Sequence, residues 1–238
     1  MIQPTIIVSL YRGWRSGYDC RHVNAIARAL AAYMTIPYQL VCVTDIPAGI
    51  TECETYPLWE VGVDKVGYGK PNCFWRLRLH DKEFACQFGE LVVSMDIDCA
   101  IFKDPSPLFR GGEPFKIIRG TERENALNGS MWMVRPGAHQ EIWDTFDART
   151  VVAEIKVARL TAGRHVAGSD QALMALRILD PATWGPEDGV YSWRFHVEPA
   201  GEVPANARMV FFAGRRKPWD RSVGVAVPAV AEQYLRFF

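Results

Sequence analysis

Two carboxylates follow an apolar run near the middle of the sequence. The run LVVSM at residues 91–95 predicts a central strand covered on both faces, and Asp96 and Asp98 come directly after it. Side chains alternate along an extended backbone, so these two carboxylates point to the same side. Neighbouring carboxylates repel each other unless a cation lies between them, and Mg²⁺ and Mn²⁺ prefer such oxygen ligands. We therefore expect a divalent metal at Asp96 and Asp98, with open positions for phosphate oxygens.

A strand followed by Asp-x-Asp has other interpretations. Asp favours strand ends, so the pair could simply begin a turn. The pattern also opens the haloacid-dehalogenase-like phosphohydrolases, in which the first Asp is the nucleophile and the second the acid. Those enzymes usually carry the strand near the N-terminus and Gly-Thr after the motif, whereas Cys99 and Ala100 follow it here. The phosphohydrolase remains the minor alternative.

Two later segments carry groups that suit a sugar or a phosphate. Ser169 is a good helix N-cap, and Asp170 and Gln171 then fall in the first turn, where the helix dipole favours an ionised carboxylate. Such groups can bind sugar hydroxyls and stabilise a positively charged sugar. The segment GRRKPW at residues 214–219 offers three cations for phosphate. The plainer interpretations are an acid that complements a helix terminus and a solvated basic loop.

Strand-like and helix-like segments alternate in the first half of the chain. Short apolar runs predict strands at residues 5–10, 38–43, 55–59, 91–95, 115–118 and 130–134. Apolar residues at helical spacing predict helices at residues 23–34, 74–86, 139–146, 151–160, 170–179 and 227–238. This order predicts an α/β fold with a mixed, mostly parallel central sheet and helices on both faces. With no linker to divide the chain, we expect one domain over residues 1–238.

The composition is that of an ordinary globular protein. With 27 basic and 27 acidic residues, the chain gives no signal of duplex nucleic-acid binding. The N-terminus lacks the layout of a signal peptide, and no apolar run has the length of a transmembrane segment. The six cysteines form no CxxC pair. We expect a reduced, cytoplasmic protein.

The motifs occur in an order that resembles a known enzyme family. In sequence they are VSLYRGW, VCVTD, FWRLRL, VVSMDIDCAIFKDPSPLF, NGSMWMVRPG, GSDQALM, YSWRF and ARMVFFAGRRKPWD. This ordered set, which spans nearly the whole chain, is similar to the GT-A-fold glycosyltransferases of the glycogenin-like, retaining group, especially their short bacterial and phage relatives. The resemblance implies transfer of a sugar from a nucleoside diphosphate, with uridine diphosphate (UDP) expected, to an acceptor hydroxyl. It also implies retention of the anomeric configuration.

The resemblance further implies roles for individual residues. Asp96 and Asp98 would bind Mn²⁺ or Mg²⁺, and Asp170 and Gln171 would lie beside the reacting sugar carbon. The implied donor-binding residues are Ser9, Leu10, Tyr11, Arg76, Asn128, Gly214 and Lys217. The first three would contact the base and ribose, and Arg76 would reach toward the phosphates and sugar. Asn128 would contact the sugar, and Gly214 and Lys217 would bind the diphosphate. The acceptor is left open among a glycan, a lipid, a protein and a modified base.

One part of the family pattern is missing. The resemblance implies a His that opens the last motif and completes the metal ligands, but Phe211 stands at that position. Ala213 occupies the other His position of a neighbouring register, and His196 is a less favoured ligand from another loop. These departures keep a second alternative open, a donor-binding protein without transfer activity.

Overall fold

The computed structural model describes residues 2–12, 17–61, 73–120, 126–161 and 168–238. Within these ranges, seven strands form the larger sheet, in the spatial order β3 (Glu54–Pro57), β2 (Gln39–Thr44), β1 (Thr5–Leu10), β4 (Val92–Met95), β7 (Leu127–Val134), β6 (Phe115–Arg119) and β8 (Ala182–Trp184). All neighbours pair in parallel except β7, which is antiparallel to β4 and β6. The predicted α/β fold with a mixed, mostly parallel sheet is confirmed.

A smaller sheet links two segments that are far apart in the sequence. In the described part of the chain it consists of β5 (Cys99–Ile101), β10 (Met209–Phe211) and β9 (Val190–Ser192). β10 is antiparallel to β5, with Phe211 opposite Cys99, and parallel to β9. This pairing brings the chain that follows β4 next to the segment that contains the GRRKPW motif.

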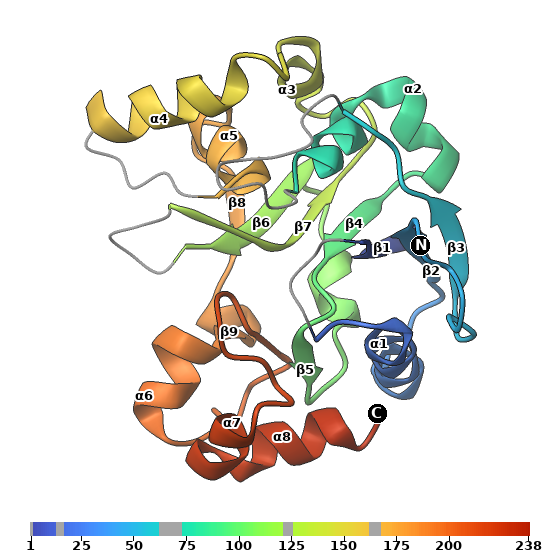
Figure 1. Cartoon of the computed structure of the whole chain (residues 1–238), viewed down its shortest axis with the longest axis vertical. Helices are drawn as coiled ribbons and strands as arrows, with labels where there is room; N and C mark the ends of the chain where they lie inside the picture. Colours follow the sequence, from blue (N-terminus) through green and yellow to red (C-terminus); the bar gives the residue numbers. More distant parts are fainter. Residues whose placement is uncertain (1, 13–16, 62–72, 121–125, 162–167) are drawn as a thin grey trace.

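Helices pack on both faces of the larger sheet, as predicted. The apolar side chains of β1 are buried on both sides: Ile6 and Val8 pack with Val23 of the first helix, whereas Ile7 packs with Phe74. The α-helices are α1 (Cys20–Tyr33), α2 (Lys82–Ala85), α3 (Gln140–Asp144), α4 (Val151–Thr161), α5 (Asp170–Arg177), α6 (Glu198–Ala200), α7 (Arg221–Ala226) and α8 (Pro228–Leu235). The small sheet and the last three helices lie together, at the end of the molecule opposite α3 and α4 (Figure 1).

Shorter helical turns complete the chain. The 3-10 turns are η1 (Phe74–His80), η2 (Cys86–Phe88), η3 (Ser106–Phe109) and η4 (Pro186–Asp188), and η5 (Trp193–Val197) is a π-helical turn. The single helix expected at residues 74–86 is therefore divided. Asp81 separates η1 from α2 and caps α2, because its side chain accepts a hydrogen bond from Glu83 N at 3.3 Å.

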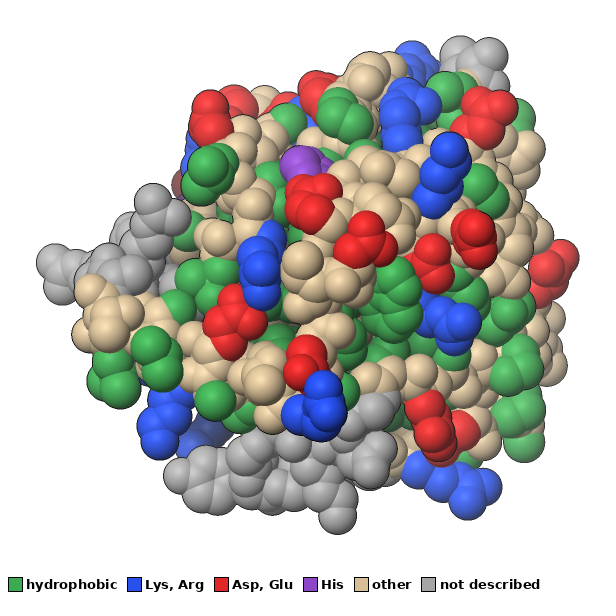
Figure 2. Space-filling view, turned by 90° about the horizontal axis from the view of Figure 1, so that it is seen from above, with side chains coloured by type: hydrophobic (Ala, Val, Ile, Leu, Met, Phe, Trp, Pro, Cys, Tyr) green, Lys and Arg blue, Asp and Glu red, His purple; other side chains and the backbone are tan. Residues whose placement is uncertain are grey.

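The surface and the cysteines agree with the composition. Acidic and basic side chains are interspersed over the face shown in Figure 2, consistent with their equal numbers. The six cysteines all fall within the described ranges and are free thiols. Among the helices described, none has the length and apolar character needed to cross a membrane.

Candidate active site

A cavity of about 590 Å³ lies where the carboxyl ends of β1 and β4 meet the small sheet. The predicted site residues that line it are Ser9, Tyr11, Arg76, Asp96, Asp98, Asn128, Asp170, Gln171, Gly214 and Lys217. Leu10 is the exception, since its side chain is buried in the apolar cluster beside α1. Ligands of open α/β sheets bind at the carboxyl ends of strands, so this cavity has the expected position.

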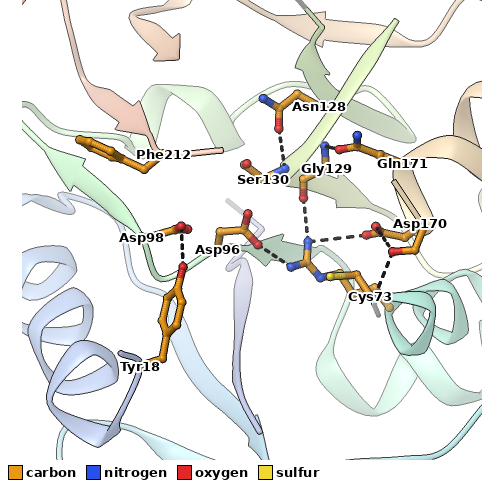
Figure 3. Close-up of polar contacts among 12 residues, drawn as sticks. Tyr18, Cys73, Asp96, Asp98, Asn128, Gly129, Ser130, Asp170, Gln171 and Phe212 are labelled. Carbon is orange, nitrogen blue, oxygen red and sulfur yellow. Dashed lines mark hydrogen bonds and ion pairs between the residues drawn. The ribbon is translucent and has the colours of Figure 1, made fainter. Parts of the chain in front are cut away.

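Arg76 connects Asp96, Gly129 and Asp170, three residues that lie close together in Figure 3. Its guanidinium forms an ion pair with Asp96, donates a hydrogen bond to the carbonyl oxygen of Gly129 at 2.7 Å, and lies 3.6 Å from Asp170 Oδ2. Arg76 and Asp170 are each only 4% exposed. A guanidinium is planar and presents its donors in a fixed geometry, so buried Arg76 positions the carboxylates of Asp96 and Asp170 at the cavity.

Asp98 lines the cavity together with the chain that follows β10. Its Oδ2 accepts a hydrogen bond from the Tyr18 hydroxyl at 2.8 Å and forms an ion pair with Lys217 Nζ. The backbone NH of Phe212 donates to the Asp98 carbonyl at 3.1 Å. Burial raises the pKa of Asp98 to about 6, an effect that Lys217 opposes and Asp96 increases.

Asp170 and Gln171 start α5, as predicted, and reach the cavity beside β7. Gln171 Oε1 accepts from the backbone NH of Gly129 at 2.9 Å. Ser169 precedes the helix, but its hydroxyl accepts from Cys73 N at 3.0 Å and donates to Asp170 at 3.3 Å. Burial raises the pKa of the Asp170 carboxyl, and the Arg76 charge opposes that shift.

Asn128 lies inside a strand. β7 begins at Leu127, three residues earlier than expected, and the Asn128 side chain accepts a hydrogen bond from Ser130 N at 2.9 Å. The Ser130 carbonyl accepts from Asp96 N at 2.8 Å, which ties this strand to the carboxylate segment. The register of β7 therefore places Asn128 on the cavity wall.

Sequence reasoning missed three contributors to the site. Tyr18 lies just before α1, and its hydroxyl is the second donor to Asp98. Cys73 orients Ser169, and Phe212 provides both backbone contacts to the Asp98 and Lys217 pair. A lone Tyr, Cys or Phe in the sequence carries no spacing signal, so only the folded chain reveals these roles.

The carboxylate oxygens of Asp96 and Asp98 suit a divalent metal that also binds a diphosphate. Asp96 and Asp98 offer hard oxygen ligands on the cavity wall, and the Lys217 ammonium marks a position for positive charge against Asp98. Mg²⁺ is typically bound by one or two carboxylates together with water and substrate phosphates. The two carboxylates would hold the metal only as part of such a complex.

A third protein ligand is not found in the part of the chain that is described. There, no three His, Cys, Asp or Glu side chains form a group able to hold a metal. Phe211 is 1% exposed in the apolar core, and Ala213 lines the cavity without a donor atom. His196 Nδ1 accepts from Ser192 N at 3.0 Å and lines a separate cavity of about 150 Å³. The metal thus remains a prediction from the sequence.

Comparison with solved structures identifies the fold. The galactosyltransferase LgtC in complex with donor and acceptor sugar analogs superposes with a TM-score of 0.60 at 12% identity, covering 98% of this chain and 95% of LgtC. An active-site mutant of LgtC gives 0.61 at 11% identity, covering 98% and 94%. GlyE of Streptococcus pneumoniae TIGR4, another glycosyltransferase, gives 0.56 at 10% identity, covering 99% of this chain and 63% of GlyE.

No protein-family model matches the sequence, and no curated protein matches it. The similarity is therefore one of fold, and the chain has the GT-A-type fold of these glycosyltransferases. The finer glycogenin-like grouping remains a prediction.

Proposed function

We propose that this protein transfers a sugar from a nucleoside diphosphate sugar, with UDP as the expected nucleotide, to an acceptor hydroxyl. One observation carries the proposal: within a glycosyltransferase fold, Asp96, Asp98, Asp170 and Lys217 converge on a single cavity. The same cavity receives Ser9 and Tyr11, the residues expected to contact the nucleoside. Because β1, β7 and the chain that follows β10 all contribute to its wall, we also propose that residues 1–238 act as one domain.

The cations of the site suit the departure of a diphosphate. When bound at Asp96 and Asp98, Mn²⁺ or Mg²⁺ would offset the negative charge that develops on the leaving group. Lys217 supplies a further positive charge on the same wall, with its side chain only 12% exposed. At such a largely buried position, an ammonium stabilises a phosphate oxygen more strongly than it does in water. Arg76 acts indirectly, by holding Asp96 and Asp170 in place.

Asp170 and Gln171 would contact the transferred sugar. Asp170 Oδ2 is buried and, among the described residues, accepts no hydrogen bond, although Arg76 lies nearby. A sugar hydroxyl would satisfy this oxygen, and the carboxylate would stabilise positive charge on the ring. Gln171 is fixed by Gly129 N, so its amide is preorganised beside the same position. Retention of configuration is expected from the family resemblance.

Titration calorimetry with UDP, with and without Mn²⁺, tests the nucleotide, and product analysis with a panel of UDP-hexoses tests the transfer. We expect UDP to bind and one hexose donor to be consumed. If UDP binds in neither condition while another nucleoside diphosphate binds, the base is wrong but the reaction class survives. If none binds, the donor assignment is wrong.

Asp98→Ala distinguishes a transferase from a donor-binding protein without activity, and a phosphate-release assay tests for a phosphohydrolase. A transferase loses turnover and the Mn²⁺-dependent part of nucleotide binding, whereas a donor-binding protein without activity shows no turnover in either form. A phosphohydrolase would release inorganic phosphate from phosphomonoesters. The glycosyltransferase fold gives the phosphohydrolase no support. A reduced, cytoplasmic location remains our expectation, consistent with the six free thiols.

A further inference from the structure

Several contacts hold the ammonium of Lys217 against Asp98. Besides its ion pair with Asp98 Oδ2, Lys217 Nζ donates to the carbonyl oxygen of Phe212 at 3.1 Å and lies 5.4 Å from the centre of the Tyr18 ring. The side chains of Lys217 and Asp98 are 12% and 8% exposed. This burial distinguishes Lys217 from the lysines of a solvated basic loop.

The backbone around Lys217 keeps the contact in place. Lys217 N donates to Asp220 Oδ2 at 2.7 Å, and Phe212 N donates to the Asp98 carbonyl at 3.1 Å. Gly214 has a φ of 105°, a conformation that favours glycine and lets the chain turn between Phe212 and Lys217. Both ends of the loop are therefore anchored next to the second carboxylate of the Asp-x-Asp motif.

We propose that Lys217 occupies, in the donor-free protein, the position on Asp98 that a divalent metal takes in the donor complex, so that metal and nucleoside diphosphate bind cooperatively. This inference rests on the proposed function. The Tyr18 hydroxyl and the Lys217 ammonium together occupy both lone pairs of Asp98 Oδ2, and an ammonium and a metal on one carboxylate repel each other. A diphosphate offers Lys217 a strong alternative partner, and the flexible lysine stem allows the exchange. Because linkage is reciprocal, each ligand then strengthens the binding of the other.

The charged residues that line the cavity also favour cooperative binding of the metal and the diphosphate. Among the described lining residues, the acidic ones are Asp96, Asp98 and Asp170, and the basic ones are Arg76, Arg194 and Lys217. This balance means that a metal alone adds uncompensated positive charge and a diphosphate alone adds uncompensated negative charge. Together they nearly cancel. Within the described residues no third protein ligand joins Asp96 and Asp98, which makes the metal still more dependent on the diphosphate.

The first test measures Mn²⁺ binding without nucleotide, from the loss of the electron paramagnetic resonance signal of free Mn²⁺. In the wild-type protein we expect weak binding that tightens at least about fivefold with saturating UDP, the lower end of typical coupling. Lys217→Gln removes the competing charge. It should bind Mn²⁺ at least about fivefold more tightly than wild type without UDP. Arg215→Gln, which removes an exposed charge from the same loop, is the matched control and should change this affinity little.

The second test starts from the other partner of the pair. Asp98→Asn releases Lys217, so in metal-free buffer this variant should bind UDP, or inorganic pyrophosphate as a probe without a base, more tightly than wild type. Loss of the carboxylate charge alone also favours an anion, so the same change in a Lys217→Gln background is the control and should give a smaller gain. Both expected results are gains of affinity, which a variant that fails to fold cannot produce.

The outcomes separate this inference from the proposed function. Equal Mn²⁺ affinity with and without UDP in wild type, no gain in Lys217→Gln, or no gain of anion binding in Asp98→Asn would each overturn the inference. Failure of every nucleoside diphosphate to bind wild type instead removes the proposed function. The Mn²⁺ comparison between wild type and Lys217→Gln needs no nucleotide, so it still decides whether Lys217 competes with a metal at Asp98.

Discussion

Arg76 and Asp170 face each other in the cavity wall, with 3.6 Å between a guanidinium nitrogen and the carboxylate oxygen Oδ2. The same guanidinium is paired with Asp96 and bonded to the Gly129 carbonyl. One buried side chain therefore links the end of β4, where the metal is expected, to the start of α5, where the sugar is expected. The geometry of both depends on it.

Replacing Arg76 should therefore impair stability and activity together. Arg76→Met leaves two carboxylates without their buried cation, and we expect the free energy of unfolding to fall by about 3–5 kcal/mol. Arg76→Lys keeps the charge but cannot reach all three acceptors, so it should cost less stability while still lowering turnover. Urea unfolding and sugar-transfer rates measure the two effects. Arg159→Met, an exposed arginine on α4, is the control; equal losses in both Met variants would contradict the assigned role.

Asp170→Asn tests whether the carboxylate acts on the sugar. The amide keeps the shape of the side chain but removes its charge, so UDP binding should persist while turnover falls on the order of 10²-fold. Stability should not fall much, because burial already disfavours the charged form of this carboxyl. Turnover and UDP titration of the same preparation check this. Unchanged turnover would mean that Asp170 only complements the start of α5.

Gly129→Ala probes the close contact between β7 and α5. A Cβ at Gly129 would lie 3.2 Å from Gln171 Cβ and 3.3 Å from Gln171 Oε1, which is tighter than ordinary van der Waals contact. Gln171 must then shift, and we expect turnover to fall about tenfold, an increase of about 1.4 kcal/mol in the barrier. A Cβ at Gly112 meets nothing within 4 Å, so Gly112→Ala is the matched control and should keep full turnover.

The parts of the fold that the sequence predicted are those with long, regular patterns. β1, β2 and β4 are buried apolar runs, and α1 carries an apolar face across its 14 residues. The strands β5, β8, β9 and β10 have three residues each, which is too short for a periodic signal. They form through pairing with distant segments, and the sequence alone does not indicate those partners.

The candidate site shows the same division. Asp96 and Asp98 were predictable because a buried strand precedes them, and Asp170 because it starts a helix. The ion pair between Lys217 and Asp98 was not, since it depends on the small sheet. Arg76 was expected to reach the donor phosphates, but its guanidinium is engaged by protein carboxylates and a carbonyl. Only the fold shows which side chains share a partner.

His80 should make the stability of the protein depend on pH. It is fully buried against Trp132, with ring centroids 5.2 Å apart, and burial lowers its pKa from 6.5 to about 4. Between these values the unfolded chain binds a proton that folded His80 does not, so the contribution of His80 to stability falls by about 3 kcal/mol as the pH drops from 6.5 to 4. Urea unfolding at a series of pH values measures this. His80→Gln should flatten the slope over that window, and an unchanged slope would contradict the assignment.

A histidine in place of Ala213 should add a protein ligand to the expected metal. Ala213 lines the cavity directly after Phe212, whose backbone contacts Asp98 and Lys217, so an imidazole there can join the carboxylates. We expect Ala213→His to bind Mn²⁺ about tenfold more tightly in the presence of UDP, about 1.4 kcal/mol. Phe211→His is the informative contrast: Phe211 is 1% exposed in the core, so this change should cost about 3 kcal/mol of stability without tightening the metal. Mn²⁺ resonance titrations and urea unfolding measure the two effects. If Phe211→His strengthened Mn²⁺ binding instead, residue 211 and not residue 213 would lie beside the metal.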